Sequence, residues 1–171
     1  CNERVRIFMI RILLFGASGK MGQEILAIAK KDRSLKIAHL VDAKNNVSLI
    51  KAKGVDLVID FSVAAAHKEI LKWCAKNRVP LLSGTTGLGA ADRQAHRRLA
   101  KEIPMLWASN MSLGITVLKQ MLKTFGALKG FKFEIQETHH IQKKDRPSGT
   151  AITLQEELGH YVSKKNLAPK I

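Results

Sequence analysis

Two stretches of the sequence combine residue types and spacings that suit chemistry on a ligand. The first is the loop Gly16-Ala17-Ser18-Gly19-Lys20-Met21-Gly22, between an apolar run and a helical pattern. Its glycines permit a tight turn, let backbone N–H groups approach a pyrophosphate and let the helix pack closely on its strand. The N-terminus of the helix adds partial positive charge. The loop predicts a dinucleotide site, with an ordinary strand-to-helix turn as the alternative.

The second stretch runs from Glu137 to Ala151 and contains adjacent histidines, His139 and His140, followed by Lys143. These side chains offer proton donors near neutral pH and positive charge for an anionic substrate. Ser148-Gly149-Thr150 then opens a helical pattern, whose free N–H groups and hydroxyls suit a carboxylate. A metal site is disfavoured because no Cys or acidic cluster lies at ligand spacing. A solvated basic loop is the other alternative.

Short apolar runs alternate with longer segments of helical periodicity, which indicates βαβ units and a parallel sheet. The predicted strands are 10–15, 36–41, 55–59, 79–82 and 103–107. The predicted helices are 21–30, 64–76, 90–101, 112–122 and 150–161. The expected fold is therefore α/β, with a Rossmann-like sheet in the first part of the chain.

Polar or glycine-rich loops follow these strands, and in an open α/β sheet such loops converge on one ligand crevice. Asp42 follows the second strand, where a carboxylate would accept hydrogen bonds from the adenosine ribose; a solvated turn aspartate is the alternative. Lys44 could meet a 2′-phosphate, so both NADH and NADPH are expected as cofactors. The remaining residues expected to bind the nucleotide are Phe61, Ser62, Gly84, Thr85, Thr86, Ala108, Ser109, Asn110 and Met111.

A change of pattern suggests a second domain. Residues 132–138 alternate apolar and polar side chains, which predicts a strand with one buried face. The sequence thus predicts a dinucleotide-binding domain over 1–128 and a smaller α+β substrate-binding domain over 129–171. No further strand-like run follows, so we expect this second domain to be truncated, with a chain ending at Ile171 that binds NADH, reduces substrate poorly and self-associates through 132–138.

The composition limits the classes of function. The 171 residues carry 29 Lys+Arg against 14 Asp+Glu, a formal charge of +15, with 5% aromatic residues. This charge attracts anions, but basic residues are spread over helix faces and no nucleic-acid recognition motif occurs. No apolar run is long enough to span a membrane. The two cysteines have no nearby partners. We expect a cytoplasmic protein with neither nucleic acid nor membrane as partner.

Several stretches together resemble the dihydrodipicolinate reductase (4-hydroxy-tetrahydrodipicolinate reductase) family of bacterial lysine biosynthesis. They occur in the family's order: 16–22, Asp60-Phe61-Ser62, Gly84-Thr85-Thr86-Gly87, Asn110-Met111-Ser112-Leu113-Gly114 and 137–151. The resemblance implies a Rossmann-like nucleotide domain, a second α+β domain, hydride transfer from NADH or NADPH, a small dicarboxylate substrate and a homotetramer.

The resemblance also implies roles for single residues. His139 would be the proton donor and Lys143 its partner, while His140, Ser148, Gly149 and Thr150 would hold the substrate carboxylates. Ile141 and Gln142 stand where the family usually has basic residues, and Met111 where an aromatic residue is common. Two rival functions are another two-domain dehydrogenase, acting on aspartate or a sugar, and a nucleotide-binding module without turnover.

Overall fold

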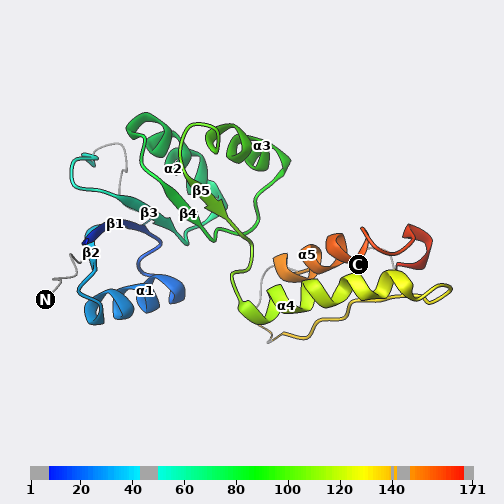
Figure 1. Ribbon diagram of the computed structural model, residues 1–171. Coiled ribbons are helices and arrows are strands. Elements are labelled where there is room, and N and C mark those ends of the chain that lie inside the picture. The colour runs from blue at the N-terminus through cyan, green and yellow to red at the C-terminus, as the bar shows by residue number, and fades with distance from the viewer. Residues whose placement is uncertain (1–7, 43–49, 140, 142–146, 168–171) are drawn as a thin grey trace, which may run out of the picture. The chain divides into compact units, whose positions relative to one another are not determined.

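The computed structural model describes residues 8–42, 50–139, 141 and 147–167, and its elements are labelled in Figure 1. The chain divides into two compact units, Cys1–Ala108 and Ser109–Ile171. Each unit is described by itself below. Among the described helices, none is long and apolar enough to cross a membrane.

The first unit contains a sheet of five parallel strands in the order β2-β1-β3-β4-β5. Its strands are β1 (Ile10–Phe15), β2 (Leu35–Val41), β3 (Leu57–Asp60), β4 (Leu81–Ser83) and β5 (Met105–Trp107). The predicted α/β, Rossmann-like class is confirmed. The last three strands begin later than predicted, because Val55, Val79 and Ile103 are buried but precede the hydrogen-bonded ladder.

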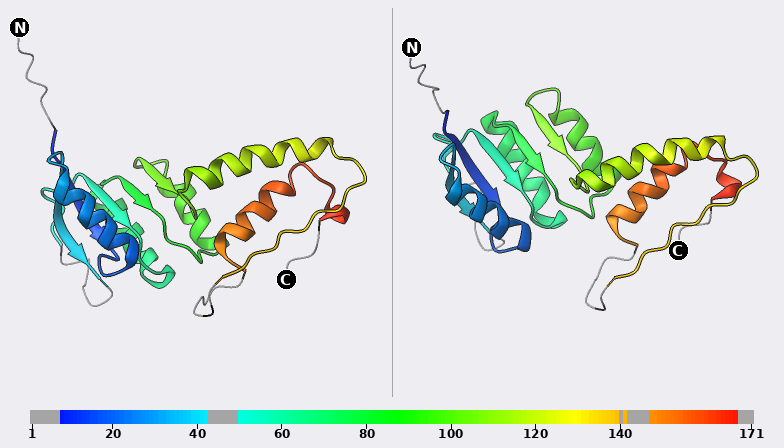
Figure 2. Two further views of the ribbon diagram at one scale, coloured as in Figure 1. Left: turned by 90° about the horizontal axis from the view of Figure 1, so that it is seen from below. Right: turned by 60° about the horizontal axis from the view of Figure 1, so that its bottom comes forward.

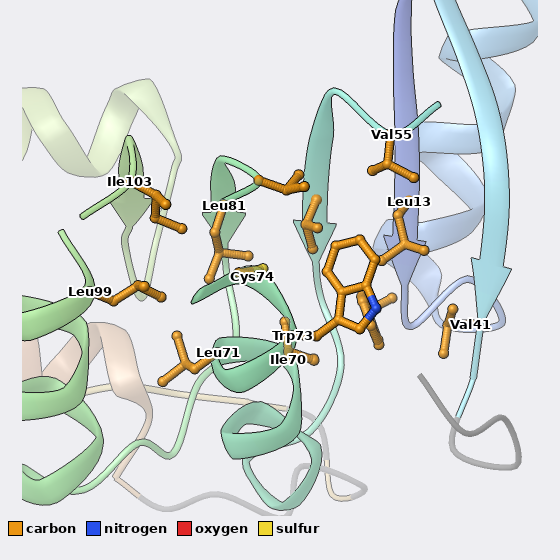
Figure 3. Packing of buried hydrophobic residues seen from close by; sticks show 13 residues of the cluster. Leu13, Val41, Val55, Ile70, Leu71, Trp73, Cys74, Leu81, Leu99 and Ile103 are labelled. Carbon is orange, nitrogen blue, oxygen red and sulfur yellow. The ribbon is translucent and has the colours of Figure 1, made fainter. Parts of the chain in front are cut away.

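Helices cover both faces of this sheet (Figures 1 and 2). Alternate side chains of β1 point to opposite faces, as a strand's period of two requires. Leu13 and Phe15 pack with α2 (Ala64–Asn77) and the end of α3 (Ala90–Leu99) in the larger core, shown in Figure 3. Ile12 and Leu14 pack on the other face against apolar side chains of α1 (Lys20–Lys31). β1 is therefore buried on both sides, which explains its almost unbroken apolar sequence.

The second unit pairs α4 (Leu113–Leu122) with α5 (Gly149–Leu158), and short 3₁₀ turns η2 (Lys123–Ala127) and η3 (Lys164–Asn166) follow these helices. The extended segment that follows η2 in sequence runs back alongside the helices (Figure 2). Phe133 anchors this segment: its ring stacks on Phe125 at 5.5 Å, and its N–H donates to the carbonyl of Asn166 at 2.7 Å.

Two expectations for this unit differ from the structure. The predicted strand over 132–138 is wrong: the segment is extended, but its only described ladder contact is an isolated bridge between Phe133 and Leu167, so an alternating pattern without a neighbouring strand forms no sheet here. The division between the units also lies earlier than the predicted 128/129 boundary. The helix α4 belongs to the second unit because it packs on η2 and α5.

Candidate functional site

The glycine loop has the geometry of a tight strand-to-helix turn. Gly16 has a φ of 75°, a left-handed conformation that favours glycine. The N–H of Gly19 donates to the carbonyl of Gly16 at 3.0 Å, and α1 begins at the next residue. Gly22 is buried, and a Cβ there would lie 2.2 Å from the Gly16 carbonyl oxygen. The close approach predicted for these glycines is therefore required by the backbone itself.

The loops after β1, β3 and β4 meet at Phe61. A Cβ on Gly16 would lie 2.4 Å from the carbonyl oxygen of Phe61, so the glycine loop rests on the Phe61 backbone. A Cβ on Gly84 would lie 2.2 Å from the Phe61 ring. The predicted convergence of these loops at the carboxyl end of the sheet is thus present in the first unit. Gly16 and Gly84 have no side chains and therefore leave room for Phe61.

Asp42 contacts the glycine loop directly. Its Oδ1 accepts hydrogen bonds from the Ser18 N–H at 3.0 Å and from the Ser18 hydroxyl at 2.9 Å. The Asp42 carboxylate therefore lies against the glycine loop, directly after the end of β2, where the adenosine ribose is expected. Lys44, the predicted partner for a 2′-phosphate, lies outside the described residues.

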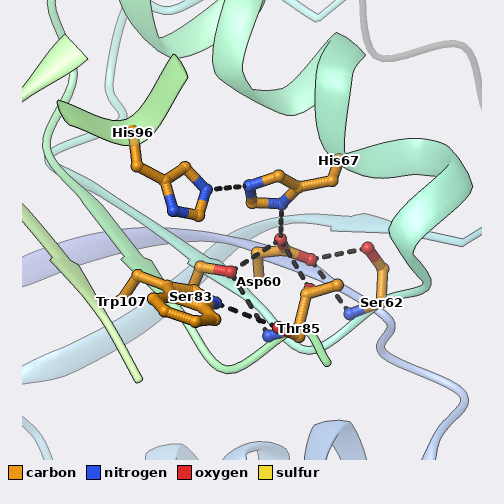
Figure 4. Close-up of polar contacts among 7 residues, drawn as sticks. All are labelled: Asp60, Ser62, His67, Ser83, Thr85, His96 and Trp107. Atoms are coloured by element: carbon orange, nitrogen blue, oxygen red, sulfur yellow. Dashed lines mark hydrogen bonds and ion pairs between the residues drawn. The ribbon is translucent and has the colours of Figure 1, made fainter. Parts of the chain in front are cut away.

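A buried carboxylate, Asp60, ends β3 and contacts residues of the loops after β3 and β4 (Figure 4). Its Oδ1 accepts from the Ser62 N–H at 2.9 Å and the Ser62 hydroxyl at 2.6 Å. Its Oδ2 accepts from the hydroxyls of Thr85 at 2.8 Å and Ser83 at 3.1 Å, and contacts His67 Nδ1 at 2.9 Å. Burial opposes ionisation, but the hydrogen bonds from His67, Ser62 and Thr85 outweigh it and lower the pKa of the Asp60 carboxyl.

Two imidazoles continue this cluster away from the loops. His67 Nε2 makes a short contact with His96 Nε2, and the His96 ring lies 5.4 Å from that of Trp107. Burial, and then the neighbouring His67, lower the pKa of His96 to about 4. His96 is therefore neutral near pH 7. Within the described part of the chain, His96 Nδ1 is a buried nitrogen without a hydrogen-bond partner.

The two threonines of the β4 loop face different ways. Thr85 is 1% exposed and directs its hydroxyl to Asp60, whereas Thr86 is exposed. The Thr85 carbonyl accepts a hydrogen bond from the Trp107 indole N–H at 3.0 Å. The Ala108 N–H is bound to the Ser83 carbonyl at 3.1 Å. Of the two hydroxyls expected near the nicotinamide ribose, Thr86 is the one that solvent reaches.

In the second unit, Glu137 joins the histidine segment to the N-terminus of α5. The Glu137 carboxylate accepts hydrogen bonds from the Ser148 N–H at 2.7 Å and from the Ser148 hydroxyl. It also contacts His139 Nε2 at 2.9 Å. The side-chain and backbone hydrogen bonds from Ser148, and then the bond from His139, lower the pKa of Glu137 to about 2. An ionised carboxylate thus orients the expected proton donor.

The start of α5 also contacts the segment after β5. Asn110 Nδ2 donates to the Thr150 hydroxyl at 2.8 Å, and the hydroxyls of Ser109 and Thr153 lie 2.9 Å apart. Ser148 caps the helix by accepting from the Ala151 N–H at 3.1 Å, so α5 begins at Gly149. Ser109 and Asn110, which were expected to contact the nucleotide, thus lie beside residues expected to hold substrate. Met111 is 42% exposed.

Some predicted residues cannot be placed, and others were missed. His140, Gln142 and Lys143 lie outside the described residues, while Ile141 is 92% exposed. The sequence reasoning assigned no role to Asp60, Glu137, His67 or His96. Glu137 carries a detectable signal, an acid two residues before a histidine pair. The contact between His67 and His96 joins positions 29 residues apart, and no local pattern predicts it.

Comparisons with known proteins cover both units. A family model described as dihydrodipicolinate reductase, N-terminus, matches residues 10–111, and the corresponding C-terminus model matches residues 114–170. The chain is 44% identical over 156 residues to the 4-hydroxy-tetrahydrodipicolinate reductase of Bdellovibrio bacteriovorus, covering 91% of this chain and 68% of the relative. The enzyme of the same name from Xanthomonas axonopodis pv. citri is 38% identical, over 86% and 68% of the two chains.

Solved structures share the fold. A dipicolinate-bound dihydrodipicolinate reductase from Paenisporosarcina sp. TG-14 superposes with a TM-score of 0.68 at 24% identity, covering 90% of this chain and 67% of the other. An oxidoreductase from Agrobacterium radiobacter in complex with NAD+, L-tartaric acid and magnesium gives a TM-score of 0.64 at 15% identity, over 95% and 59%. Since two family models and curated relatives match along both units, the chain belongs to the dihydrodipicolinate reductase family.

Proposed function

We propose that this chain catalyses the reduction of 4-hydroxy-tetrahydrodipicolinate, a cyclic imine dicarboxylate, to tetrahydrodipicolinate in lysine and diaminopimelate biosynthesis. NADH or NADPH is the hydride donor. The geometric observation that carries this assignment is the bridge made by Glu137, which places His139 next to the helix N-terminus at Ser148. A proton donor beside a cradle for carboxylates suits a dianionic imine whose reduction requires a proton.

The first unit would hold the nucleotide through its strand-end loops. The loop Gly16 to Gly22 has the close backbone packing that lets N–H groups face a pyrophosphate at the N-terminus of α1. Asp42 would accept from the ribose hydroxyls, and Thr86 with Phe61 and Ser62 would line the nicotinamide ribose. NAD(P)H supplies the hydride when bound. The residues of this chain orient it and keep the loops in place.

The second unit would bind the substrate and deliver the proton. The first N–H groups of α5, at Gly149 and Thr150, have no carbonyl partners within the helix and suit a substrate carboxylate. Lys143 and His140 would add positive charge there, as the family resemblance implies. The product lacks the 4-hydroxyl group of the substrate, so the net reaction adds a hydride and a proton and releases the hydroxyl group as water. His139, oriented by Glu137, would supply that proton as NAD(P)H supplies the hydride to the ring.

Assembly and compartment belong to this proposal as well. Leu113, Val117 and Met121 lie one helical turn apart on α4 and are 78%, 51% and 57% exposed. Exposed apolar side chains in a row mark a surface that associates with protein, which supports a homo-oligomer, a homotetramer by family resemblance. Light scattering that gives a monomer would contradict it.

The buried free thiol of Cys74 is compatible with a cytoplasmic enzyme. Detection of the protein only in an oxidising compartment would exclude a cytoplasmic location.

The reaction can be tested by following nucleotide oxidation with the cyclic imine and with each of NADH and NADPH. We expect turnover with both nucleotides and competitive inhibition by dipicolinate, a dicarboxylate of similar shape. Nucleotide binding without turnover would instead support a binding module. Turnover of an aspartate-derived or sugar substrate, with none of the imine, would support the rival dehydrogenase assignment.

Asp42→Ala is expected to weaken NADH binding more than NADPH binding. The carboxylate would accept from both ribose hydroxyls of NADH, whereas NADPH carries a phosphate on one of them. Loss of hydrogen bonds to a charged group costs about 1.5–3 kcal/mol, which is roughly tenfold or more in Kd. Titration of nicotinamide fluorescence with each nucleotide measures the difference.

The control for Asp42→Ala is Ser18→Ala, because Ser18 is the loop residue to which Asp42 is bound. Removal of the Ser18 hydroxyl loosens the same contact but keeps the Asp42 carboxylate. Ser18→Ala should therefore change the two affinities by a similar, smaller factor. Equal losses of NADH and NADPH in Asp42→Ala would show that Asp42 acts only on the loop and does not recognise the ribose.

A further inference from the structure

We infer that Asp60 is a positioning residue for the nucleotide pocket: it ties the loop after β3 to the loop after β4 and so fixes the surface that meets the nicotinamide ribose. This inference rests on the proposed nucleotide site. It adds Asp60 and His67, which had no expected role, and gives Thr85 an indirect role, because all three residues are at most 1% exposed.

Besides its contact with His67 on α2, the Asp60 side chain is hydrogen-bonded to residues at the ends of both strands. One carboxylate oxygen receives both donors of Ser62, at 2.9 and 2.6 Å, and holds the loop after β3. The other receives the Thr85 and Ser83 hydroxyls, at 2.8 and 3.1 Å, and holds the loop after β4 (Figure 4). The Gly84 N–H also donates to the Asp60 carbonyl at 2.8 Å. A single residue thus sets the separation of two ligand-facing loops.

The histidines hold the carboxylate in this orientation. His67 contacts Asp60 Oδ2 through Nδ1 and His96 through Nε2, so both ring nitrogens of this buried imidazole have partners. Asp60 cannot turn away from Thr85 without also breaking the contact of its Oδ2 with His67 Nδ1, and leaving a buried polar group unpaired is costly.

The same cluster explains why Thr85 and Thr86 differ. The Thr85 hydroxyl is committed to Asp60, whereas Thr86 at the next position is exposed. Thr85 therefore acts on the nucleotide through loop geometry, and Thr86 is the threonine placed to touch it. The packing of Phe61 against Gly16 and Gly84 carries the same constraint to the glycine loop.

The strand β3 offers a matched pair of carboxylates for the test. Asp56 directly precedes the strand and accepts from the Arg11 N–H at 2.8 Å and from its guanidinium at 2.9 and 2.8 Å, whereas Asp60 ends the strand. Asp56→Asn and Asp60→Asn each replace with an amide a carboxylate that joins neighbouring segments. An amide nitrogen at the Oδ2 position of Asp60 cannot accept the donors of Thr85 and His67. Both variants should lower Tm, but only Asp60→Asn should raise the Kd of NADH and NADPH.

A milder pair keeps the proposal testable if Asp60→Asn does not fold. Thr85→Val replaces the hydroxyl with a methyl group of similar shape, and Thr85→Ser keeps the hydroxyl. We expect Thr85→Val to raise the Kd of both nucleotides roughly threefold to tenfold, the worth of one hydrogen bond, and Thr85→Ser to restore most of the affinity. A structural role alone would lower Tm without this pattern of loss and rescue.

Titrations well below each variant's Tm separate the outcomes. If the parent protein binds neither nucleotide, the proposed function fails and this inference fails with it. If the parent binds but Thr85→Val, and Asp60→Asn where it folds, bind equally well, the inference alone is overturned and the cluster only stabilises the fold. An equal loss of affinity in Asp56→Asn would also overturn it, because the effect would then not depend on the end of β3.

Discussion

His139→Gln is expected to lower kcat by about 10²–10⁴-fold, the usual worth of one general acid. Glutamine can still donate to Glu137, which lies 2.9 Å from the imidazole Nε2, so the variant preserves the local hydrogen bond. It lacks an acidic proton that can be transferred near neutral pH. The measurement is steady-state oxidation of NADH with saturating imine, together with the Kd of NADH. We expect kcat to fall and the Kd to stay unchanged.

The control for this substitution is His160→Gln, an exposed histidine that follows α5 in the same unit. It makes the same His-to-Gln substitution at a residue with no expected contact with the substrate, so kcat should stay within about twofold of the parent if the general-acid assignment is specific. Turnover of His139→Gln close to that of His160→Gln would remove His139 from the role of proton donor. The proton would then have to come from another group or from solvent.

The sequence predicts the sheet of the first unit well because each strand has a local signal. Strands with buried, nearly unbroken apolar runs and helices with one apolar stripe do not need distant partners to be recognised. The glycine loop is equally local, since the packing that excludes a Cβ at Gly16 and Gly22 comes from the turn and the neighbouring Phe61. These features explain why the sheet and the glycine turn of the first unit could be predicted from the sequence.

The errors concern contacts that depend on distant residues. The alternating segment 132–138 has a strand's pattern, but a strand also needs a partner, and the described chain supplies only the bridge from Phe133 to Leu167. The role of Asp60 is equally invisible in sequence, because its donors come from a helix and two loops up to 25 residues away. Thr85 and Thr86 are adjacent residues of the same type, so the sequence does not distinguish them. Only the fold turns one inward and the other to solvent.

Gly22→Ala is expected to abolish most nucleotide binding, although alanine is normally the better residue in a helix by about 1 kcal/mol. The added Cβ would lie 2.2 Å from the Gly16 carbonyl oxygen and 2.7 Å from the Ala17 Cα and carbonyl oxygen. All of these are backbone atoms, so no side chain can rotate away to relieve the overlap. Either the loop or the N-terminus of α1 must move.

That movement should lower both the stability of the fold and the affinity for the nucleotide. Overpacking costs about 1–3 kcal/mol, more than the helix propensity returns, so Tm should fall. Because the displaced atoms form the turn that presents N–H groups to a pyrophosphate, a shift of the loop should also raise the Kd of NADH and NADPH together, by roughly tenfold to a hundredfold. Fluorescence titration and thermal unfolding measure the two effects separately.

Gly114→Ala is the matched control, because Gly114 is also in the first turn of its helix, α4. Among the described residues, a Cβ there would meet only the Ser112 hydroxyl oxygen, at an ordinary contact distance of 3.6 Å. Here the helix propensity of alanine should prevail: Tm should stay the same or rise, with both nucleotide affinities unchanged. If Gly22→Ala behaved in the same way, the close packing of the glycine loop would not be what shapes the pyrophosphate site, and the nucleotide would have to be placed elsewhere on the sheet.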